Sequence, residues 1–580
     1  MNIRESMKMI LVWLCLIAVM TPLAMGEEQE KSYTFQANVM IPMRDGVKLA
    51  ANLFIPKEGG PFPVILIRSP YDKKDEKAGE AIGFAERGYA VVYQDARGKF
   101  DSEGIWDPFR YDVEDGCDTL AWTGQQSWCN GKIATFGGSY VGFTQWALAP
   151  CGSPYLTAMM PIVPFTQAYY DTNYCGGALQ LALMMGWGTL VSFKEGEKPP
   201  QIDWDKSFRQ LPLKTWDDAI GREIFYLRDW VAHPTYDDYW KKRGIDGRYE
   251  DVAVPILNVG GWYDIFSKIT LEQIANVRHR SKNLLARRNQ FAIVGPWGHG
   301  VNQTKLGELE FGQSAKIEMS KLQDDWYGYW LKNEETGVEN WPPYRLYVMG
   351  ENVWRNENEW PLARTQYTNY YLHSQGKANT SSGNGALYLA EPEMKTADSF
   401  VYDPDNPVPT KGGNNLFGAA AGPFDQQEIE KRDDVLVYTT LPLTQEVEAT
   451  GPVKMILYAS STAKDTDFTA KLVDVHPDGK AFNLCDGILR ARYRNSSTDL
   501  ELIEPGKIYK YEIDMWATSN LFLEGHCIRL EISSSNFPRF DRNPNSGQPF
   551  GTDKEVFKAT QTIYHDAEHP SHLILPVIPR

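Results

Sequence analysis

Residues 132–149 read KIATFGGSYVGFTQWALA, and the order of residue types in this stretch decides the fold. A short apolar run, Ile133 to Phe136, ends in two glycines and Ser139, and an apolar segment of helical length follows at once. The pattern predicts a strand, a tight turn and a helix. Only small neighbours allow a serine to occupy such a strained turn, which pushes its hydroxyl above the edge of the sheet. We therefore predict that Ser139 is a nucleophile.

The rest of the chain supplies two partners for this serine. A glycine-rich turn with an ordinary serine would look the same locally, so the context has to decide. Asp264 follows the apolar run 254–259, and His299 follows the run 291–294, each on a loop after a predicted strand. Alone, Asp264 could be a helix N-cap and His299 a surface histidine. Together the order serine, acid, histidine is that of an α/β-hydrolase triad.

Alternating strands and helices surround the serine stretch. Two apolar runs, 63–68 and 89–95, contain almost no polar residue, as strands that are buried on both faces of a parallel sheet require. Helical stretches at 77–87 and 112–125 separate successive strands, and a hairpin over 33–55 with an Asp-Gly turn precedes them. This order predicts an α/β-hydrolase fold with a doubly wound sheet.

Two loops next to these strands carry further candidates. Tyr71 follows the run 63–68 at the sheet end where ligands bind, so its hydroxyl could donate to an oxyanion, although a tyrosine packed in a loop is the simpler interpretation. The amide of Tyr140, at the start of the helix after Ser139, could be the second donor. We expect the turn at Arg97 to be structural, with ion pairs that tie loops together.

An aromatic and glycine-rich insertion follows the strand after the serine helix. It would lie over the nucleophile as a helical cap that shapes an acyl pocket and excludes water. Most of its aromatic residues could equally form the core of the cap itself. The candidate pocket residues are Trp187, Tyr169 and Asp171 in the cap, and Trp262 and Phe266 beside the acid.

After the last helix the chain changes to short alternating strands with many turn residues. This pattern predicts an all-β domain, more consistent with a jelly-roll sandwich than with a barrel. The predicted segments are a signal peptide (1–26), the α/β-hydrolase domain (27–161 and 249–350), the helical cap (162–248) and the jelly-roll domain (351–580).

The N-terminus and the charge of the 580-residue chain limit its location and partners. Residues 1–26 have two basic residues, an apolar run and small residues before a cleavage point, which predicts a signal peptide and a secreted or periplasmic protein. A retained membrane anchor is the alternative, although the run is short for a span, and we expect no membrane association once the signal is removed. The net charge of −16 argues against nucleic acid as a partner. The sequence is compatible with a homo-oligomer.

The cysteines suit an exported protein. Six remain after Cys15 leaves with the signal, which is compatible with three disulfides. Pairing neighbours along the chain predicts Cys117–Cys129, Cys151–Cys175 and Cys485–Cys527. Since no cysteine has zinc-ligand spacing and no histidine or carboxylate cluster stands out, we expect neither a metal nor a cofactor.

Six motifs along nearly the whole mature chain point to one family. They are Ser69-Pro70-Tyr71-Asp72, Asp95-Ala96-Arg97-Gly98, Gly137-Gly138-Ser139-Tyr140-Val141-Gly142, Gly261-Trp262-Tyr263-Asp264, Gly295-Pro296-Trp297-Gly298-His299 and Ser533 to Asn543. With them the chain resembles the bacterial cocaine esterase group, relatives of the X-Pro dipeptidyl peptidases and the α-amino-acid ester hydrolases. The resemblance implies Ser139, Asp264 and His299 as the triad, and Tyr71 with the Tyr140 amide as the oxyanion hole.

The resemblance implies a serine hydrolase that cleaves an ester or amide bond of a small-molecule acyl substrate. The α-amino-acid ester hydrolases carry acidic residues just after the triad aspartate, to hold the ammonium of the substrate. Here those positions are Ile265, Phe266 and Ser267, which is more like a cocaine esterase. A carboxylate of the cap, from Asp171, Glu195 or Glu197, could still bind an amine. X-Pro dipeptidyl-peptidase or amino-acid ester and β-lactam acylase activity is therefore the alternative, and a non-catalytic sugar- or protein-binding function is a more distant one.

Overall fold

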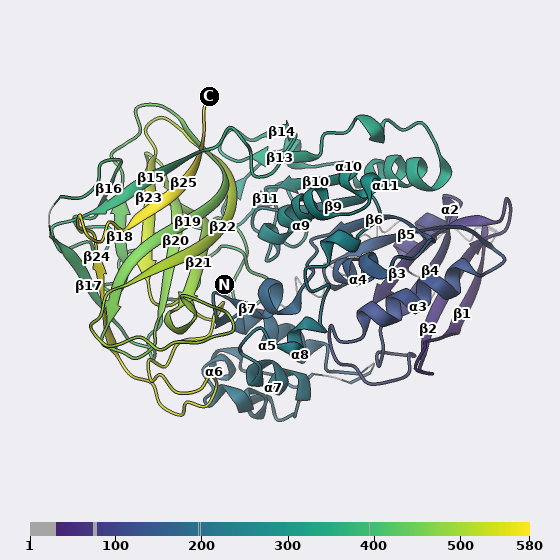
Figure 1. Ribbon diagram of the computed structural model, residues 1–580, viewed down its shortest axis with the longest axis horizontal. Helices are drawn as coiled ribbons and strands as arrows, with labels where there is room; N and C mark the ends of the chain where they lie inside the picture. The colour runs from purple at the N-terminus through teal and green to yellow at the C-terminus, as the bar shows by residue number, and fades with distance from the viewer. Residues whose placement is uncertain (1–30, 74–77, 195, 198, 394) are drawn as a thin grey trace, which may run out of the picture.

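The computed structural model consists of three parts, which Figure 1 shows side by side. It describes residues 31–73, 78–194, 196–197, 199–393 and 395–580. The expected signal peptide at 1–26 and the candidate Glu195 lie outside the described residues. Within the described ranges, none of the helices has the length and apolar character that a bilayer span requires.

A ten-stranded mixed sheet forms the hydrolase domain. Its strands are β1 (Tyr33–Pro42), β2 (Lys48–Pro56), β3 (Phe62–Ser69), β4 (Ala90–Asp95), β5 (Cys129–Gly138), β6 (Leu156–Ile162), β9 (Ile256–Gly261), β10 (Gln290–Gly295), β13 (Tyr344–Val348) and β14 (Val353–Glu357). The order across the sheet is β1-β2-β4-β3-β5-β6-β9-β10-β13-β14. From β4 to β13 all neighbours are parallel. The predicted α/β-hydrolase fold is confirmed.

Helices cover both faces of this sheet. Successive residues of a strand point to opposite faces, so a strand made of apolar residues contributes side chains to a core on each side. In β3, Leu66 packs in the same core as Trp146, whereas Ile65 packs in the same core as Phe84 and Trp326. The helices are α2 (Gly79–Glu86), α3 (Asp112–Gly124), α4 (Tyr140–Leu148), α9 (Ser267–Arg280), α10 (Leu284–Arg288) and α11 (Met319–Tyr327). The last helix expected before the all-β domain is α11, and a π-helical turn, Gly328–Lys332, follows it.

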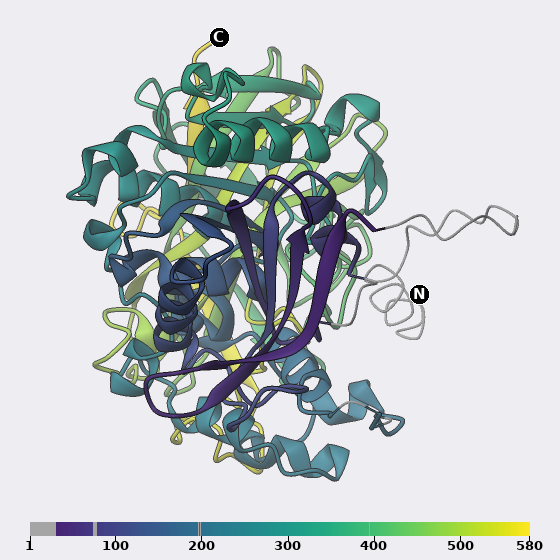
Figure 2. The same cartoon turned by 90° about the vertical axis from the view of Figure 1, so that its right-hand side faces the viewer.

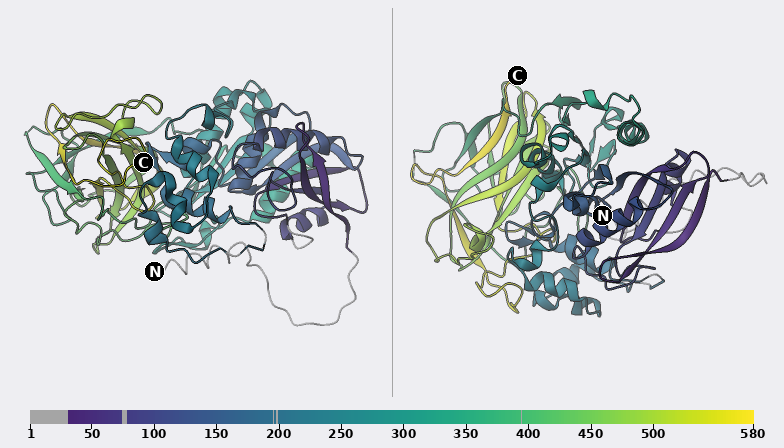
Figure 3. Two further views of the ribbon diagram at one scale, coloured as in Figure 1. Left: turned by 90° about the horizontal axis from the view of Figure 1, so that it is seen from below. Right: turned by 45° about the vertical axis from the view of Figure 1, so that its right-hand side comes forward.

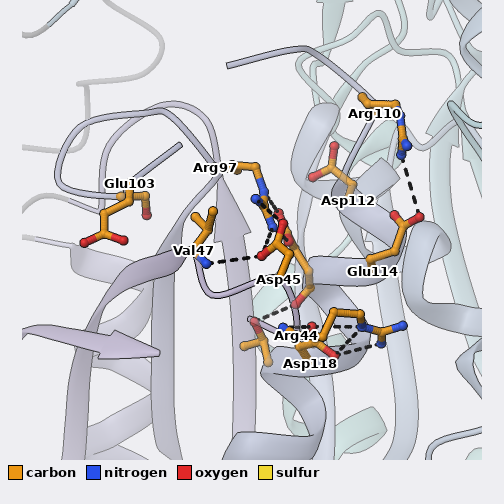
Figure 4. A network of polar contacts seen from close by, with 12 residues as sticks. Arg44, Asp45, Val47, Arg97, Glu103, Arg110, Asp112, Glu114 and Asp118 are labelled. Atoms are coloured by element: carbon orange, nitrogen blue, oxygen red, sulfur yellow. Dashed lines mark hydrogen bonds and ion pairs between the residues drawn. The ribbon is translucent and has the colours of Figure 1, made fainter. Parts of the chain in front are cut away.

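The outer edge of the sheet is the hairpin β1–β2, which faces the viewer in Figure 2. Arg97 ties this turn to α3: its guanidinium lies 2.7 Å from Asp45, a pair labelled in Figure 4, and 2.5 Å from Asp115 of α3. A second pair, Arg44 with Asp118 at 2.7 Å, joins the same elements. The structural interpretation of Arg97 is confirmed.

The cap lies between β6 and β9 in the chain. It contains a π-helical turn (Tyr169–Asn173), β7 (Tyr174–Cys175), β8 (Ala178–Leu179), α5 (Leu181–Leu190), α6 (Trp204–Phe208), a 3₁₀ segment (Leu213–Ile220), α7 (Phe225–Ala232), α8 (Asp238–Lys241) and a 3₁₀ turn (Tyr249–Asp251). Figure 3 shows these helices next to the C-terminal domain. The Tyr493 hydroxyl donates to the carbonyl of Pro234, a direct bond from that domain to the cap.

The C-terminal domain of jelly-roll type is built almost entirely of strands, as predicted. They are β15 (Gln366–His373), β16 (Ala386–Tyr388), β17 (Ala397–Tyr402), β18 (Leu436–Thr439), β19 (Val447–Ser461), β20 (Asp467–Val475), β21 (Ala481–Arg490), β22 (Tyr509–Phe522), β23 (Cys527–Ser533), β24 (Ala559–Tyr564) and β25 (His572–Ile578). The long β19 pairs with three strands, β22, β24 and β25, and so joins them in one sheet.

The hydrolase sheet reaches past the boundary expected at residue 350. Strand β14 continues from β13 through a tight turn and pairs with it, so the sheet ends at Glu357. The turn also touches the β domain, since the Met349 amide donates to the Ser519 carbonyl at 2.9 Å. Two small hairpin strands, β11 (Lys305–Leu306) and β12 (Leu309–Glu310), follow the histidine loop.

The predicted disulfide pairing is wrong. Cys117 forms a disulfide with Cys151. Helices α3 and α4 pack side by side, which brings the Cα atoms of the two cysteines to 5.8 Å from each other. The other four described cysteines form no disulfide: Cys129, Cys175, Cys485 and Cys527. Strand β20 separates Cys485 on β21 from Cys527 on β23, and the two lie opposite Leu472 and Val475 of β20, so they are about 14 Å apart, beyond the reach of a disulfide.

Candidate active site

Ser139 occupies a nucleophile elbow between β5 and α4. Its backbone has φ 61° and ψ −124°, a strained conformation for a residue with a Cβ. Gly137 has φ 134°, and a Cβ there would lie 2.2 Å from Val141. A Cβ on Gly142 would lie 3.0 Å from the Ile162 carbonyl oxygen. The small residues of the motif are therefore needed for the turn, which leaves the Ser139 hydroxyl half-buried at the sheet end.

His299 and Asp264 complete a hydrogen-bonded relay with the serine. The Nε2 atom of His299 lies 2.8 Å from Ser139 Oγ, and Nδ1 lies 2.6 Å from Asp264 Oδ1. The carboxylate is fully buried, and its other oxygen accepts from the Phe266 amide at 3.1 Å. A carboxylate beside Nδ1 favours a proton on that nitrogen, which leaves Nε2 free to accept the serine proton.

The Tyr71 hydroxyl lies at the same place. It accepts a hydrogen bond from the Trp187 indole at 3.1 Å, and its other hydrogen-bond partner is the Ser139 side chain. Because the indole supplies a donor, the phenolic hydrogen remains available for an oxygen at the reacting centre. Tyr71 can thus serve as an oxyanion donor, as predicted from its loop.

Replacing Tyr71 with phenylalanine should lower kcat by about 10²- to 10³-fold and change KM little, because such a donor acts mainly in the transition state. Steady-state kinetics on an ester substrate would measure both constants. Tyr226→Phe is a matched control, since that buried hydroxyl donates to the Gly188 carbonyl in the cap and should leave kcat nearly unchanged. An effect of Tyr71→Phe confined to KM would assign Tyr71 to substrate binding instead.

The dependence of kcat on pH above neutrality offers a second test of the role of Tyr71. Burial raises the pKa of Tyr71 to about 12, against the lowering effect of its hydrogen bonds with Trp187 and Ser139. The hydroxyl donates only while it is protonated, so a raised pKa extends its function to higher pH. We expect kcat to stay level from neutral pH through pH 10, the ordinary tyrosine pKa. A fall centred near pH 10 that Tyr71→Phe removes would contradict this.

Tyr140 can supply a second oxyanion donor through its backbone amide. It is the first residue of α4, so its amide has no acceptor within the helix. The side chain anchors the turn: its hydroxyl donates to Asp112 at 2.6 Å and accepts from the Phe109 amide at 2.8 Å. Burial raises the pKa of Asp112 to about 6, although the Arg68 guanidinium 3.6 Å away lowers it. No pattern in the sequence points to Asp112, which merely begins a predicted helix.

Apolar rings line the space next to the relay. Phe266 lies edge-on to the His299 ring at 5.7 Å and packs on Phe165 at 4.7 Å. Trp187 stacks on the ring of Tyr140 at 5.6 Å and stays half-buried. The structure therefore brings two predicted pocket residues, Phe266 and Trp187, to the triad, and adds Phe165.

Three other predicted pocket residues lie elsewhere. Trp262 is buried against Trp360, and its indole donates to the Tyr347 carbonyl. The Tyr169 ring belongs to the cap core, with its hydroxyl on the Pro234 carbonyl. The buried Asp171 carboxylate accepts from the amides of Thr166 and Gln167, both at 2.9 Å. Each of the three is fully engaged by its own surroundings.

The other acidic candidate of the cap, Glu197, is equally unavailable. Its carboxylate forms a surface ion pair with Arg222 at 2.9 Å and accepts from the Lys194 amide. An ammonium-binding carboxylate from the predicted set is therefore not present among the described residues near Ser139.

The C-terminal domain contributes a residue that the sequence did not suggest. The buried Asn414 amide nitrogen lies 2.9 Å from the Trp262 carbonyl, 2.8 Å from the Asp264 carbonyl and 3.1 Å from the Ser267 hydroxyl. Two carbonyl neighbours fix the assignment of nitrogen over oxygen at this position. Asn414 therefore holds the turn that carries the acid.

We expect Asn414→Ala to lower kcat by about tenfold or more, because a displaced acid turn misaligns His299. The buried carbonyls of Trp262 and Asp264 would lose this hydrogen-bond donor, which should also destabilise the protein by about 1–3 kcal/mol. Kinetics and thermal unfolding would measure the two effects. Asn415→Ala is the matched control: its amide binds the Gly412 carbonyl within its own loop, so stability should fall without a comparable loss of kcat. Equal losses of kcat in both variants would argue against a specific role of Asn414.

Comparisons with known proteins identify the family of this chain. Residues 45–301 match the family model of the X-Pro dipeptidyl-peptidase (S15 family), and residues 336–574 match the X-Pro dipeptidyl-peptidase C-terminal non-catalytic domain. The cocaine esterase of Rhodococcus sp. (strain MB1 Bresler) is 41% identical over 95% of this chain and 99% of its own. The chain belongs to the cocaine esterase and X-Pro dipeptidyl-peptidase (S15) family. It is a serine hydrolase.

Two solved structures share the whole architecture of this chain. An aminopeptidase from the marine sediment archaeon Thaumarchaeota archaeon is 26% identical, with a TM-score of 0.83 over 97% of this chain and 99% of that chain. An α-amino acid ester hydrolase is 25% identical, with a TM-score of 0.81 over 96% and 98%. The S15 relatives thus include both esterases and peptidases.

Proposed function

We propose that the chain is a secreted serine esterase that hydrolyses small esters with an apolar or aromatic acyl group through an acyl-enzyme on Ser139. The observation that carries this proposal is the relay from Asp264 through His299 to Ser139, with contacts of 2.6 and 2.8 Å beside the Tyr71 hydroxyl. The apolar rings of Phe266 and Trp187 beside it favour an uncharged acyl group.

In the first step the Ser139 oxygen attacks the carbonyl carbon, and its proton passes to His299 Nε2. The carbonyl π electrons move onto the oxygen, which faces the Tyr71 hydroxyl and the Tyr140 amide. Each donor contributes about 3 kcal/mol to the stability of the transition state. When the intermediate collapses, the alkoxide leaves with the proton from His299, and the acyl group remains on Ser139.

Water completes the cycle by the same route. His299 removes a proton from water, the resulting hydroxide attacks the acyl-enzyme, and the Ser139 oxygen recovers its proton as the carboxylic acid leaves. Asp264 stabilises the imidazolium in both steps and is itself never protonated.

The alternative is an activity that requires a free amine, such as X-Pro dipeptidyl-peptidase or amino-acid ester and β-lactam acylase activity. The structural likeness to an aminopeptidase and to an α-amino acid ester hydrolase favours it. Against it, Asp171 and Glu197 are engaged by other groups, and an apolar Phe266 follows the acid.

A paired substrate panel separates these functions. Phenyl benzoate and p-nitrophenyl butyrate would be compared with a free-amino and an N-acylated dipeptide p-nitroanilide by kcat/KM. An esterase should prefer the simple esters by at least about 100-fold over both anilides. Preference for the free-amino anilide over its N-acylated partner would establish the peptidase function and overturn the proposal.

Secretion is supported by two independent features. Residues 1–26 have the composition of a signal peptide, and Cys117–Cys151 requires an oxidising compartment during folding. Mass spectrometry of the protein recovered from its source should find a chain that begins at Glu27. A full-length chain retained in the cell would contradict this.

A further inference from the structure

Two histidines and an aspartate lie together in the β domain, far from Ser139 in the sequence and outside the relay. Asp474 is the second-last residue of β20, His476 immediately follows the strand, and His526 immediately precedes β23. One ligand atom from each residue lies within 4.8 Å of the other two. It is the one such group of three or more among the described residues.

The strand register explains why these side chains meet. Residues two apart on a strand point to the same face, so Asp474 and His476 share a face. Val475 pairs with Cys527 in the antiparallel β20–β23 ladder, which places His476 opposite His526. The opposite face holds Val473 and Val475, which pack with Cys527 in a small apolar cluster.

The nitrogen and oxygen atoms of these three side chains lie close together. The rings of His476 and His526 lie 4.4 Å apart, and His526 Nδ1 lies 2.8 Å from Asp474 Oδ1. Among the described residues, the ring nitrogens of His476 have no hydrogen-bond partner. Asp474 and His526 are buried and His476 is half-buried at the surface, so one coordination position faces solvent.

Neighbouring residues hold the cluster in place. The Asn520 amide donates to the second oxygen of Asp474 at 3.2 Å, and Phe482 packs edge-on to His476 at 4.9 Å. An outer contact of this kind on a carboxylate orients it as a ligand. The backbone on both sides of Asn520 bonds to Met349, at the edge of the hydrolase domain.

We propose that Asp474, His476 and His526 bind one divalent transition-metal ion, with Zn²⁺ as the best match, at an open three-residue site that clamps the β20–β23 ladder. Two imidazoles, one carboxylate and a water would complete a tetrahedral set. Zinc at about 2.1 Å from each ligand requires ligand atoms about 3.4 Å apart. The pair formed by His526 Nδ1 and Asp474 Oδ1 would open slightly from 2.8 Å. His476 would close by up to about 1.4 Å, which a small rotation of its half-buried side chain can supply.

Calorimetry on the full chain, purified without a histidine tag and stripped with a chelator, tests the proposal. Zinc chloride should bind the wild type with one equivalent per chain and raise its Tm. His476→Ala and His476→Gln should each weaken that binding by at least about tenfold and abolish the shift in Tm. Because the His476 ring is half-buried and makes no hydrogen bond with the described residues, both variants should fold.

A matched variant and a second probe complete the test. His279→Ala removes an exposed histidine at the end of α9 and should bind zinc as the wild type does. Cobalt(II) should give visible ligand-field bands with the wild type that disappear in His476→Ala. Equal zinc affinity of the wild type and His476→Ala, or no binding to the wild type in large excess of zinc, would overturn the proposal.

Discussion

Ser139→Ala is expected to lower kcat by about 10⁶-fold and to abolish covalent labelling by a fluorophosphonate, because within the described part of the chain no other nucleophile is held against His299. Residual turnover would reflect the oxyanion hole and substrate binding alone. Labelling followed by intact-mass measurement checks the prediction directly. Ser153→Ala, in the loop just after α4, should label fully. A labelled Ser139→Ala protein would disprove the assignment of the nucleophile.

Asp264→Asn should lower kcat by about 10⁴-fold with little change in KM. An amide in place of the fully buried carboxylate can donate to His299 Nδ1, which favours the wrong tautomer and removes the charge that stabilises the imidazolium. Steady-state kinetics and thermal unfolding would separate this effect from a loss of folding.

The matched control for the acid is Asp171→Asn, which neutralises another buried carboxylate of similar exposure. Its contacts are with the backbone of the cap, so Tm should fall while kcat changes far less than in Asp264→Asn. Comparable losses of kcat in the two variants would mean that the effect at Asp264 is a general consequence of a damaged interior.

The sequence predicts the elbow and the relay well because each part is local. A strand, two glycines, a serine and a helix lie within 132–149, and the strands β9 and β10 each end at a loop that carries one partner. The parallel order of β5, β6, β9 and β10 then brings these loop ends to the same edge of the sheet. Only the strand order had to be assumed.

Neighbours in sequence proved poor guides to neighbours in space where side-chain direction matters. Trp262 lies two residues before Asp264, yet its indole turns into the core toward Trp360. Cys117 lies closer in sequence to Cys129 than to Cys151, but the packing of α3 against α4 selects the more distant partner. Periodicity identifies elements, but it does not give their packing partners.

Residues contributed from distant segments could not be predicted at all. Asn414 lies 150 residues from Asp264, in a glycine-rich loop with no catalytic pattern. The Asp474 and His476 pair resembles an ordinary strand end until β23 brings His526 beside it. Both depend on long-range strand pairing, which the spacing along the chain does not show.

The contact of Asn414 with the acid turn also bears on how this enzyme can be divided and recombined. A chain that stopped at Glu357 would retain Ser139, Asp264 and His299 and the complete ten-stranded sheet. It would nevertheless lose the amide that meets the carbonyls of Trp262 and Asp264. The β domain is therefore no exchangeable module, and a chimaera of two such enzymes should keep the acid turn and the loop around residue 414 from the same parent.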